Sequence, residues 1–199
     1  MSAAAISEDD SARNRELIAL LKACTVLITY RKEMLGTGFF VAPSLIITCA
    51  HVVKNRRQVT IKRSQEECEG SVVRMLPEPW KEVEIAFPDV ALIRVPVSSH
   101  PCALLDENFD ARDQLYVFGY SGVGVGGESL TSECEGTRSY EKGNPDADFI
   151  KFKDTQVWPG TSGSPLLNQR TGKVCGMVKR TRDEKAALGG LAVLSLIHI

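Results

Sequence analysis

The sequence predicts an all-β protein built as an antiparallel sandwich or barrel, and three observations lead to this fold class. Short runs of β-branched and aromatic residues recur through most of the chain, with Gly, Pro, Asn and Asp between them. These runs follow one another at intervals of about 8–15 residues, as strands joined by turns do. No helical pattern lies between them, whereas parallel strands would need crossover helices of about ten residues or more.

The first element is expected to be a helix over residues 8–23, because Leu17, Ile18, Leu20 and Leu21 form one apolar stripe. The predicted strands follow from Cys24 onward, and they are CTVLITY, GTGFFVA, SLIITCA, QVTIKR, SVVRML, VALIRV, QLYVFGY, FIKFK, SPLLN, KVCGMVKR and GLAVLSLI.

Three polar or glycine-rich stretches interrupt the series of strands. The polar segment 100–112 divides the strands into two sets, so we expect an N-terminal extension over 1–23 and two lobes over 24–111 and 112–199. Residues 119–129 are expected to form a flexible glycine-rich turn, and residues 133–148 a long polar surface loop.

Composition excludes several classes of partner. The chain has 199 residues and a formal net charge of −1, so nothing in its overall charge favours nucleic acid or an anionic membrane. No apolar run reaches the roughly 18 residues that span a bilayer. Acidic residues precede the first apolar cluster and no early basic stretch is present, so the N-terminus does not resemble a secretory signal.

The six cysteines are spread singly through the chain, without the paired spacing of a zinc site. An even number of cysteines allows three disulfides, but the lack of a signal sequence favours reduced thiols and a cytoplasmic location. No metal and no organic cofactor is expected.

Three polar residues stand at the edges of predicted strands: His51, Asp89 and Ser162. Each alone has an ordinary structural explanation, as a core histidine, a strand-end aspartate and a serine in a turn of small residues. Together they follow the chain order His, Asp, Ser, one of the few orders in which a hydrolytic triad occurs. His51 and Asp89 belong to the first lobe and Ser162 to the second, so a cleft between the lobes would bring them together.

The chemistry explains each residue type. A serine hydroxyl is a poor nucleophile at neutral pH until a neighbouring base accepts its proton. A histidine can accept this proton and later return it to the leaving amine. An aspartate beside the histidine fixes its tautomer and stabilises the imidazolium.

The segments GTGFFVAPSLIITCAHVV, DVALIRV, PGTSGSPLLN and GGLAV resemble the chymotrypsin-like serine peptidases, especially the compact bacterial trypsin-like and HtrA group. The resemblance covers about residues 24–199. It implies two six-stranded antiparallel β-barrels with the active site between them. It also implies an oxyanion hole formed by the N–H groups of Gly160 and Ser162, and Gly160 lets the chain turn without a Cβ crowding that hole.

The resemblance further implies a substrate-binding region. Gln156, six residues before Ser162, would form the base of the primary pocket, and its neutral amide offers no carboxylate for Lys or Arg. The strand 177–181 would pair with substrate backbone. Its Lys179 and Arg180 either favour an acidic or polar residue before the cut or are only solvated edge-strand charges. The substrate-binding set is therefore Gln156, Lys179, Arg180, Thr181 and Gly190.

The nucleophile segment departs from many family members at two positions. Thr161 replaces an aspartate, and Ser164 replaces a glycine. In zymogen-type relatives that aspartate pairs with a newly cut N-terminus, which a threonine cannot do, so N-terminal clipping is not expected to activate this protein.

The expected function is that of a serine endopeptidase acting on protein or peptide substrates. A regulatory partner or an additional domain, as in a defence or signalling system, would control it. The alternative is a catalytically silent binding module with the same fold.

Overall fold

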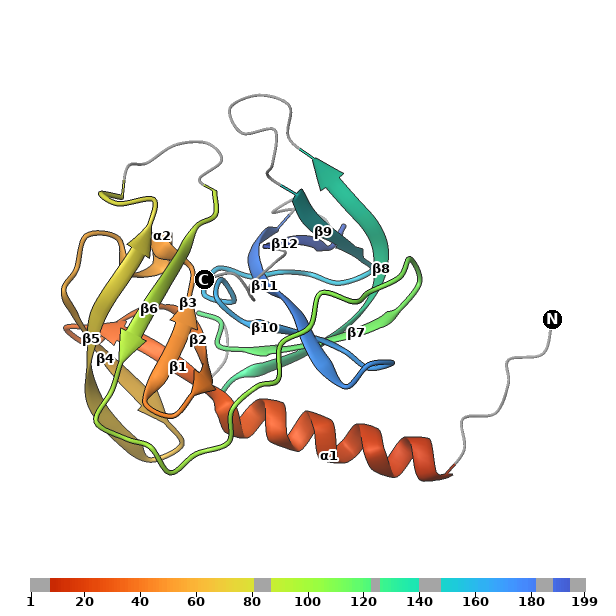
Figure 1. Cartoon of the computed structure of the whole chain (residues 1–199), viewed down its shortest axis with the longest axis horizontal. Coiled ribbons are helices and arrows are strands. Elements are labelled where there is room, and N and C mark those ends of the chain that lie inside the picture. Colours follow the sequence, from red (N-terminus) through yellow and green to blue (C-terminus); the bar gives the residue numbers. More distant parts are fainter. Residues whose placement is uncertain (1–7, 81–86, 123–125, 140–147, 182–187, 194–199) are drawn as a thin grey trace.

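The computed structural model describes residues 8–80, 87–122, 126–139, 148–181 and 188–193. Two closed antiparallel β-barrels lie side by side, with a long helix running beneath them (Figure 1). The first barrel has the strand order β1-β2-β3-β6-β5-β4 and the second the order β10-β11-β12-β9-β8-β7. The expected all-β fold with two six-stranded barrels is therefore confirmed.

The strands of the first barrel are β1 (Thr25–Tyr30), β2 (Glu33–Ala42), β3 (Leu45–Thr48), β4 (Gln58–Arg63), β5 (Glu66–Leu76) and β6 (Val90–Arg94). Those of the second are β7 (Gln114–Gly119), β8 (Glu128–Ser139), β9 (Asp148–Lys153), β10 (Pro165–Asn168), β11 (Lys173–Thr181) and β12 (Gly190–Val193). A short helix, α2 (Ala50–Val53), follows β3.

The barrels form because most of the strands have an apolar face. In β4, for example, Val59 and Ile61 are buried while the residues beside them are more exposed. The core of the second barrel includes Ile150 and Phe152 from β9, with Leu166 from β10. Each barrel therefore has an apolar interior of its own.

Strand β8 corrects one prediction. Residues 133–148 were expected to be a surface loop, which is wrong for 133–139, because they continue β8 and pair with β9. The strand is polar along most of its length, and among its later residues mainly Cys134 is buried. It is held by its two neighbouring strands rather than by an apolar stripe, so the alternation that reveals other strands is absent.

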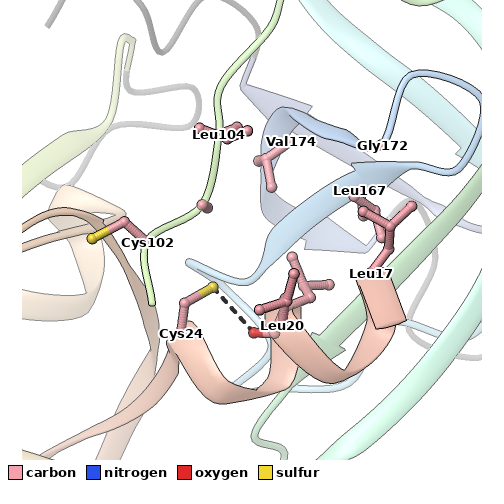
Figure 2. Close-up of a pocket in the computed structure, with 10 residues that line it drawn as sticks. Leu17, Leu20, Cys24, Cys102, Leu104, Leu167, Gly172 and Val174 are labelled. Carbon is pink, nitrogen blue, oxygen red and sulfur yellow. Dashed lines mark hydrogen bonds between the residues drawn. The ribbon is translucent and has the colours of Figure 1, made fainter. Parts of the chain in front are cut away.

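The helix predicted over 8–23 is α1 (Glu8–Cys24), and it packs where the two barrels are joined. Figure 2 shows Leu17 and Cys24 of this helix beside a pocket of about 130 Å³ that Leu104 and Val174 also line. The connecting segment first bonds the first barrel, through Ala103 N–H to the Phe40 carbonyl at 2.8 Å, and then runs beside β11. No helix among the described residues has the length and apolar character needed to cross a membrane.

Candidate active site

His51 lies on α2, directly after the buried strand β3. Ala50, Val52 and Val53 of this single helical turn are buried in the first barrel and hold the turn in place. The side chain of His51 remains 31% exposed, so its ring is fixed at one edge and open at the other.

Asp89 lies one residue before β6 and is almost fully buried. Its backbone has a φ of 54°, a left-handed conformation that aspartate tolerates better than most residues. This bend directs the carboxylate at His51 in two ways. Oδ2 lies 2.8 Å from Nδ1 of the ring, and Oδ1 accepts the backbone N–H of His51 at 3.0 Å.

The electrostatic setting keeps Asp89 ionised. Burial by itself would raise the pKa of this carboxyl group, but the hydrogen bond and charge of His51 and the charge of Lys179 outweigh it. The pKa of Asp89 therefore lies below its ordinary value. An ionised aspartate at Nδ1 fixes the tautomer that leaves Nε2 of His51 as a proton acceptor.

Ser162 lies in the second barrel, in the turn that precedes β10. Gly160 and Gly163 on either side have φ values of +100° and +88°, which favour glycine. The hydroxyl of Ser162 donates to the main-chain carbonyl of Lys179 at 2.8 Å. The hydrogen bonds found among the described residues do not include one between Ser162 and His51, so the recorded acceptor of the serine hydroxyl is the Lys179 carbonyl.

Thr37 of β2 ties the first barrel to this turn, and the sequence did not single it out. Its N–H donates to the Ser162 carbonyl at 2.9 Å, and its hydroxyl donates to the Gly160 carbonyl at 3.0 Å. The same hydroxyl accepts the N–H of Tyr120 at 2.9 Å. A threonine inside a strand is ordinary in sequence, so only the meeting of the two barrels reveals this role.

The backbone amides of the turn have different partners. Thr161 N–H bonds the Trp158 carbonyl at 3.2 Å, and Gly163 N–H bonds the Val178 carbonyl at 2.8 Å. Within the described part of the chain, the hydrogen bonds leave the N–H groups of Gly160 and Ser162 without a protein acceptor. These are the two groups expected to form the oxyanion hole.

A cavity of about 500 Å³ opens beside Ser162. Three residues expected to bind substrate line it: Gln156, Arg180 and Thr181. Trp158 is a further lining residue that the sequence did not indicate. Gly190 is buried at the start of β12, where it pairs with Phe152 and Thr181, and it is not among the lining residues.

Lys179 does not lie in this cavity either. It is only 6% exposed, and its ammonium group bonds Oδ2 of Asp89. The interpretation of Lys179 as a solvated edge-strand charge is therefore wrong. The pattern of strand alternation could not show this, since the side chain is turned inward by a local irregularity in β11.

A thiol also lies near the His51–Asp89 pair. Ligand atoms of Cys49, His51 and Asp89 lie within 4.8 Å of one another, a separation that a metal ion could bridge. Burial raises the pKa of the Cys49 thiol well above its usual range, which opposes the thiolate that a metal needs. The ammonium group of Lys179 already bonds the Asp89 carboxylate, so Cys49, His51 and Asp89 are unsuited to binding a metal cation.

The six cysteines carry free thiols in the structure. They are distributed over α1, both barrels and the segment between the barrels, and four of them are buried.

Comparisons with known proteins agree with this fold. A family model described as a trypsin-like peptidase domain matches residues 36–177. The serine protease Rv3671c of Mycobacterium tuberculosis strain H37Rv is 26% identical over 198 residues, which cover 92% of this chain. The match covers 46% of that relative, so the chain spans about half the length of the curated relatives that it matches.

Solved structures show the same fold. The inactive form of the Rv3671c protease superposes with a TM-score of 0.73 at 24% identity, covering 98% of this chain and 94% of that one. The active form from M. tuberculosis gives a TM-score of 0.70 at 24% identity, with coverages of 98% and 88%. The HtrA-type protease AlgW with a decapeptide gives 0.75 at 15% identity, covering 92% of this chain and 64% of that one. With a family model matching well over half of its residues, the chain belongs to the trypsin-like serine peptidases.

Proposed function

We propose that this domain is a serine endopeptidase in which Ser162, His51 and Asp89 form the catalytic triad. The observation that carries the proposal is the two-point hydrogen bonding between His51 and the buried Asp89. Lys179 supports it, because its ammonium contacts Asp89 while its carbonyl accepts the Ser162 hydroxyl. One residue thus contacts both the acid and the nucleophile, which come from different barrels.

The reaction begins when the Ser162 hydroxyl leaves the Lys179 carbonyl and turns to Nε2 of His51. His51 takes the proton as the serine oxygen bonds the substrate carbonyl carbon, giving a tetrahedral oxyanion. The N–H groups of Gly160 and Ser162 stabilise this oxyanion, and each such donor is worth about 3–4 kcal/mol. His51 then protonates the leaving amine as the peptide C–N bond breaks, and water hydrolyses the acyl-enzyme by the same steps.

Protein or peptide substrates fit the edge of β11. Strand β10 pairs with β11 only as far as Met177, so β10 does not cover one edge of the strand at Arg180 and Thr181. An extended peptide can add to such an edge by main-chain hydrogen bonds. The HtrA-type protease AlgW has been solved with a decapeptide, which agrees with a peptide substrate here.

The cavity beside Ser162 would receive the side chain before the cut. Gln156 is neutral and Arg180 is cationic, so an acidic or polar side chain suits the cavity better than Lys or Arg. Cleavage of a peptide library, with products sequenced by mass spectrometry, tests this. A strong preference for Lys or Arg would contradict it.

The same proposal includes control by a partner or by another domain. The Thr161 hydroxyl donates to the Trp158 carbonyl at 2.7 Å. This residue therefore stabilises its own turn, and no ion pair with a newly cut N-terminus is needed for that. The Ser162 hydroxyl donates to the Lys179 carbonyl, which fits a latent state in a partner-controlled effector, such as a defence or signalling protein. A cytoplasmic location belongs to this proposal and is supported by the free thiols.

Labelling with a fluorophosphonate tests the catalytic proposal directly. Wild-type protein should become labelled at Ser162, and Ser162→Ala should lose the label while keeping its circular dichroism spectrum. Ser71→Ala removes an exposed serine of the first barrel and should label like the wild type. A latent domain should label weakly alone and more strongly with its partner or in the full-length chain, whereas absence of label under both conditions would favour the binding module.

A further inference from the structure

Lys179 stands at a β-bulge in β11. Val178 pairs with Ala192 and Arg180 with Leu191, so Lys179 is the extra residue between two successive pairs. Residues 174–179 of β11 are all buried and Arg180 is exposed, so Lys179 is the last buried residue of the strand and coincides with the shift in register. Bulges of this kind are common near active sites.

The buried ammonium group meets the triad at one atom. It bonds Oδ2 of Asp89, the same oxygen that lies 2.8 Å from Nδ1 of His51. Both charged side chains are nearly inaccessible to solvent, and the Phe149 ring lies 5.8 Å from the ammonium nitrogen. A buried charge needs a partner, and Asp89 of the proposed triad is one for Lys179.

Opposing effects on His51 follow from this arrangement. The negative charge of Asp89 favours the protonated imidazolium, whereas the positive charge of Lys179 opposes it. Because Lys179 and the His51 ring share one carboxylate oxygen, the ammonium group offsets part of the charge that Asp89 presents to His51.

We propose that Lys179 is a positioning residue which partly neutralises Asp89 and thereby keeps His51 available as a base at lower pH. The proposal rests on the triad proposed above. In this proposal the charge of Lys179 lowers the pH at which activity is lost. The bulge in β11 then helps to place Lys179 beside Asp89, a role that pairing with substrate does not require.

The ionisable groups that act on one another in this cluster include Asp89 before β6, His51 on α2, Cys49 before α2 and Lys179 itself. Burial raises the pKa of Cys49 well above its usual range, so its thiol stays neutral where the activity is measured. Phe149 on β9 does not titrate. Changes in pH dependence on altering Lys179 therefore report on His51 and Asp89.

The test compares Lys179→Met, which keeps the length of the side chain and removes its charge, with Lys179→Arg, which keeps the charge. Lys173→Met is the matched control, because Lys173 lies on the same strand, is more exposed and pairs with Asp106 at 3.3 Å. The rate of Ser162 labelling is measured across the range in which a histidine titrates. We expect the midpoint of the acid limb to rise by about one pH unit in Lys179→Met. The control and Lys179→Arg should stay close to the wild type.

A second measurement separates this inference from the proposed function. The imidazole signals of His51 are titrated by NMR in a Ser162→Ala background, which needs no activity. If no variant is labelled but the His51 midpoint still rises in Lys179→Met, the charge effect stands and the catalytic proposal fails. Equal midpoints with and without the Lys179 charge overturn the inference. If Lys179→Met does not fold, Lys179→Gln replaces it, because its amide can still donate to Asp89 but carries no charge. The His51 midpoint of Lys179→Gln is then compared with that of the wild type in the same way.

Discussion

At the scale of single residues, Thr37 connects the barrels through more atoms than any residue of the predicted triad. Its N–H and its hydroxyl both bond the second barrel, while its carbonyl accepts the Thr48 hydroxyl at 2.6 Å within the first. Gly163 lies so close to the Thr37 carbonyl that a Cβ at this position would collide with it. The nucleophile turn is therefore shaped by a strand of the other barrel.

Replacement of Thr37 by valine should damage the turn more than the fold. Valine has nearly the same shape but no hydroxyl, so the N–H of Tyr120 loses its acceptor and the Gly160 carbonyl loses a donor. We expect a loss of about 1–3 kcal/mol in the free energy of unfolding. Ser162 labelling should slow by roughly tenfold or more.

Urea unfolding and labelling kinetics measure the two effects of this change. Thr37→Ser keeps the hydroxyl and should retain most of the labelling rate. Wild-type labelling in Thr37→Val would show that the hydroxyl does not position the turn.

The sequence indicated different residues of the site with unequal clarity. His51, Asp89 and Ser162 each have a local signal, namely a polar residue at the edge of an apolar strand or between small residues. Thr37 has none, since a threonine in a strand is ordinary. Lys179 was identified as a residue near the substrate, but its burial depends on a bulge that no sequence pattern shows.

At the scale of elements, one corner joins β7 to β10 through a buried carboxylate. Asp113 is 8% exposed and accepts hydrogen bonds from Arg170 Nε at 2.7 Å and from Asn168 Nδ2 at 2.7 Å. The N–H of Asp110 adds a further bond at 2.8 Å. The hydrogen bond from Arg170 is the main reason why the pKa of Asp113 is lowered to about 2, against the smaller opposing effect of burial.

The stability from this corner should depend on pH in a defined direction. A lowered pKa means that the folded state favours the ionised form, so the contribution is complete above the ordinary value near 3.8 and is lost as pH falls toward about 2. Asp113→Asn should therefore cost roughly 2 kcal/mol near neutral pH, and its difference from the wild type should shrink in acid.

Denaturant unfolding at several pH values measures this difference. The control is Asp110→Asn, since Asp110 is 78% exposed and pairs with Arg170 only at the surface, where ion pairs contribute little. An equal cost for both variants would mean that burial of Asp113 is not decisive.

The elements differ in how well the sequence reveals them. Most strands were predictable because one face of each is apolar. The later half of β8 was not, because its side chains are mostly polar and its position depends on β7 and β9. The single turn of α2 is too short for any helical periodicity to show.

At the scale of the whole molecule, the all-β class follows from local patterns, but the order of strands within each barrel does not. Closure joins β1 to β4 and β10 to β7, pairs that are distant in the chain and carry no mark in sequence. The resemblance to serine peptidases supplied the number of barrels, and the physical pattern alone left a sandwich open.

Because Thr37 of the first barrel bonds the nucleophile turn of the second, the domain could be divided into two fragments that are active only when they associate. A break in the connecting segment 95–113 would leave His51 and Asp89 on one fragment and Ser162 on the other. The fragment with the serine would also lack the threonine that bonds Gly160 and Ser162. Turnover would thus require complementation of both fragments in the correct register, so that the chemistry itself reports that the halves have met.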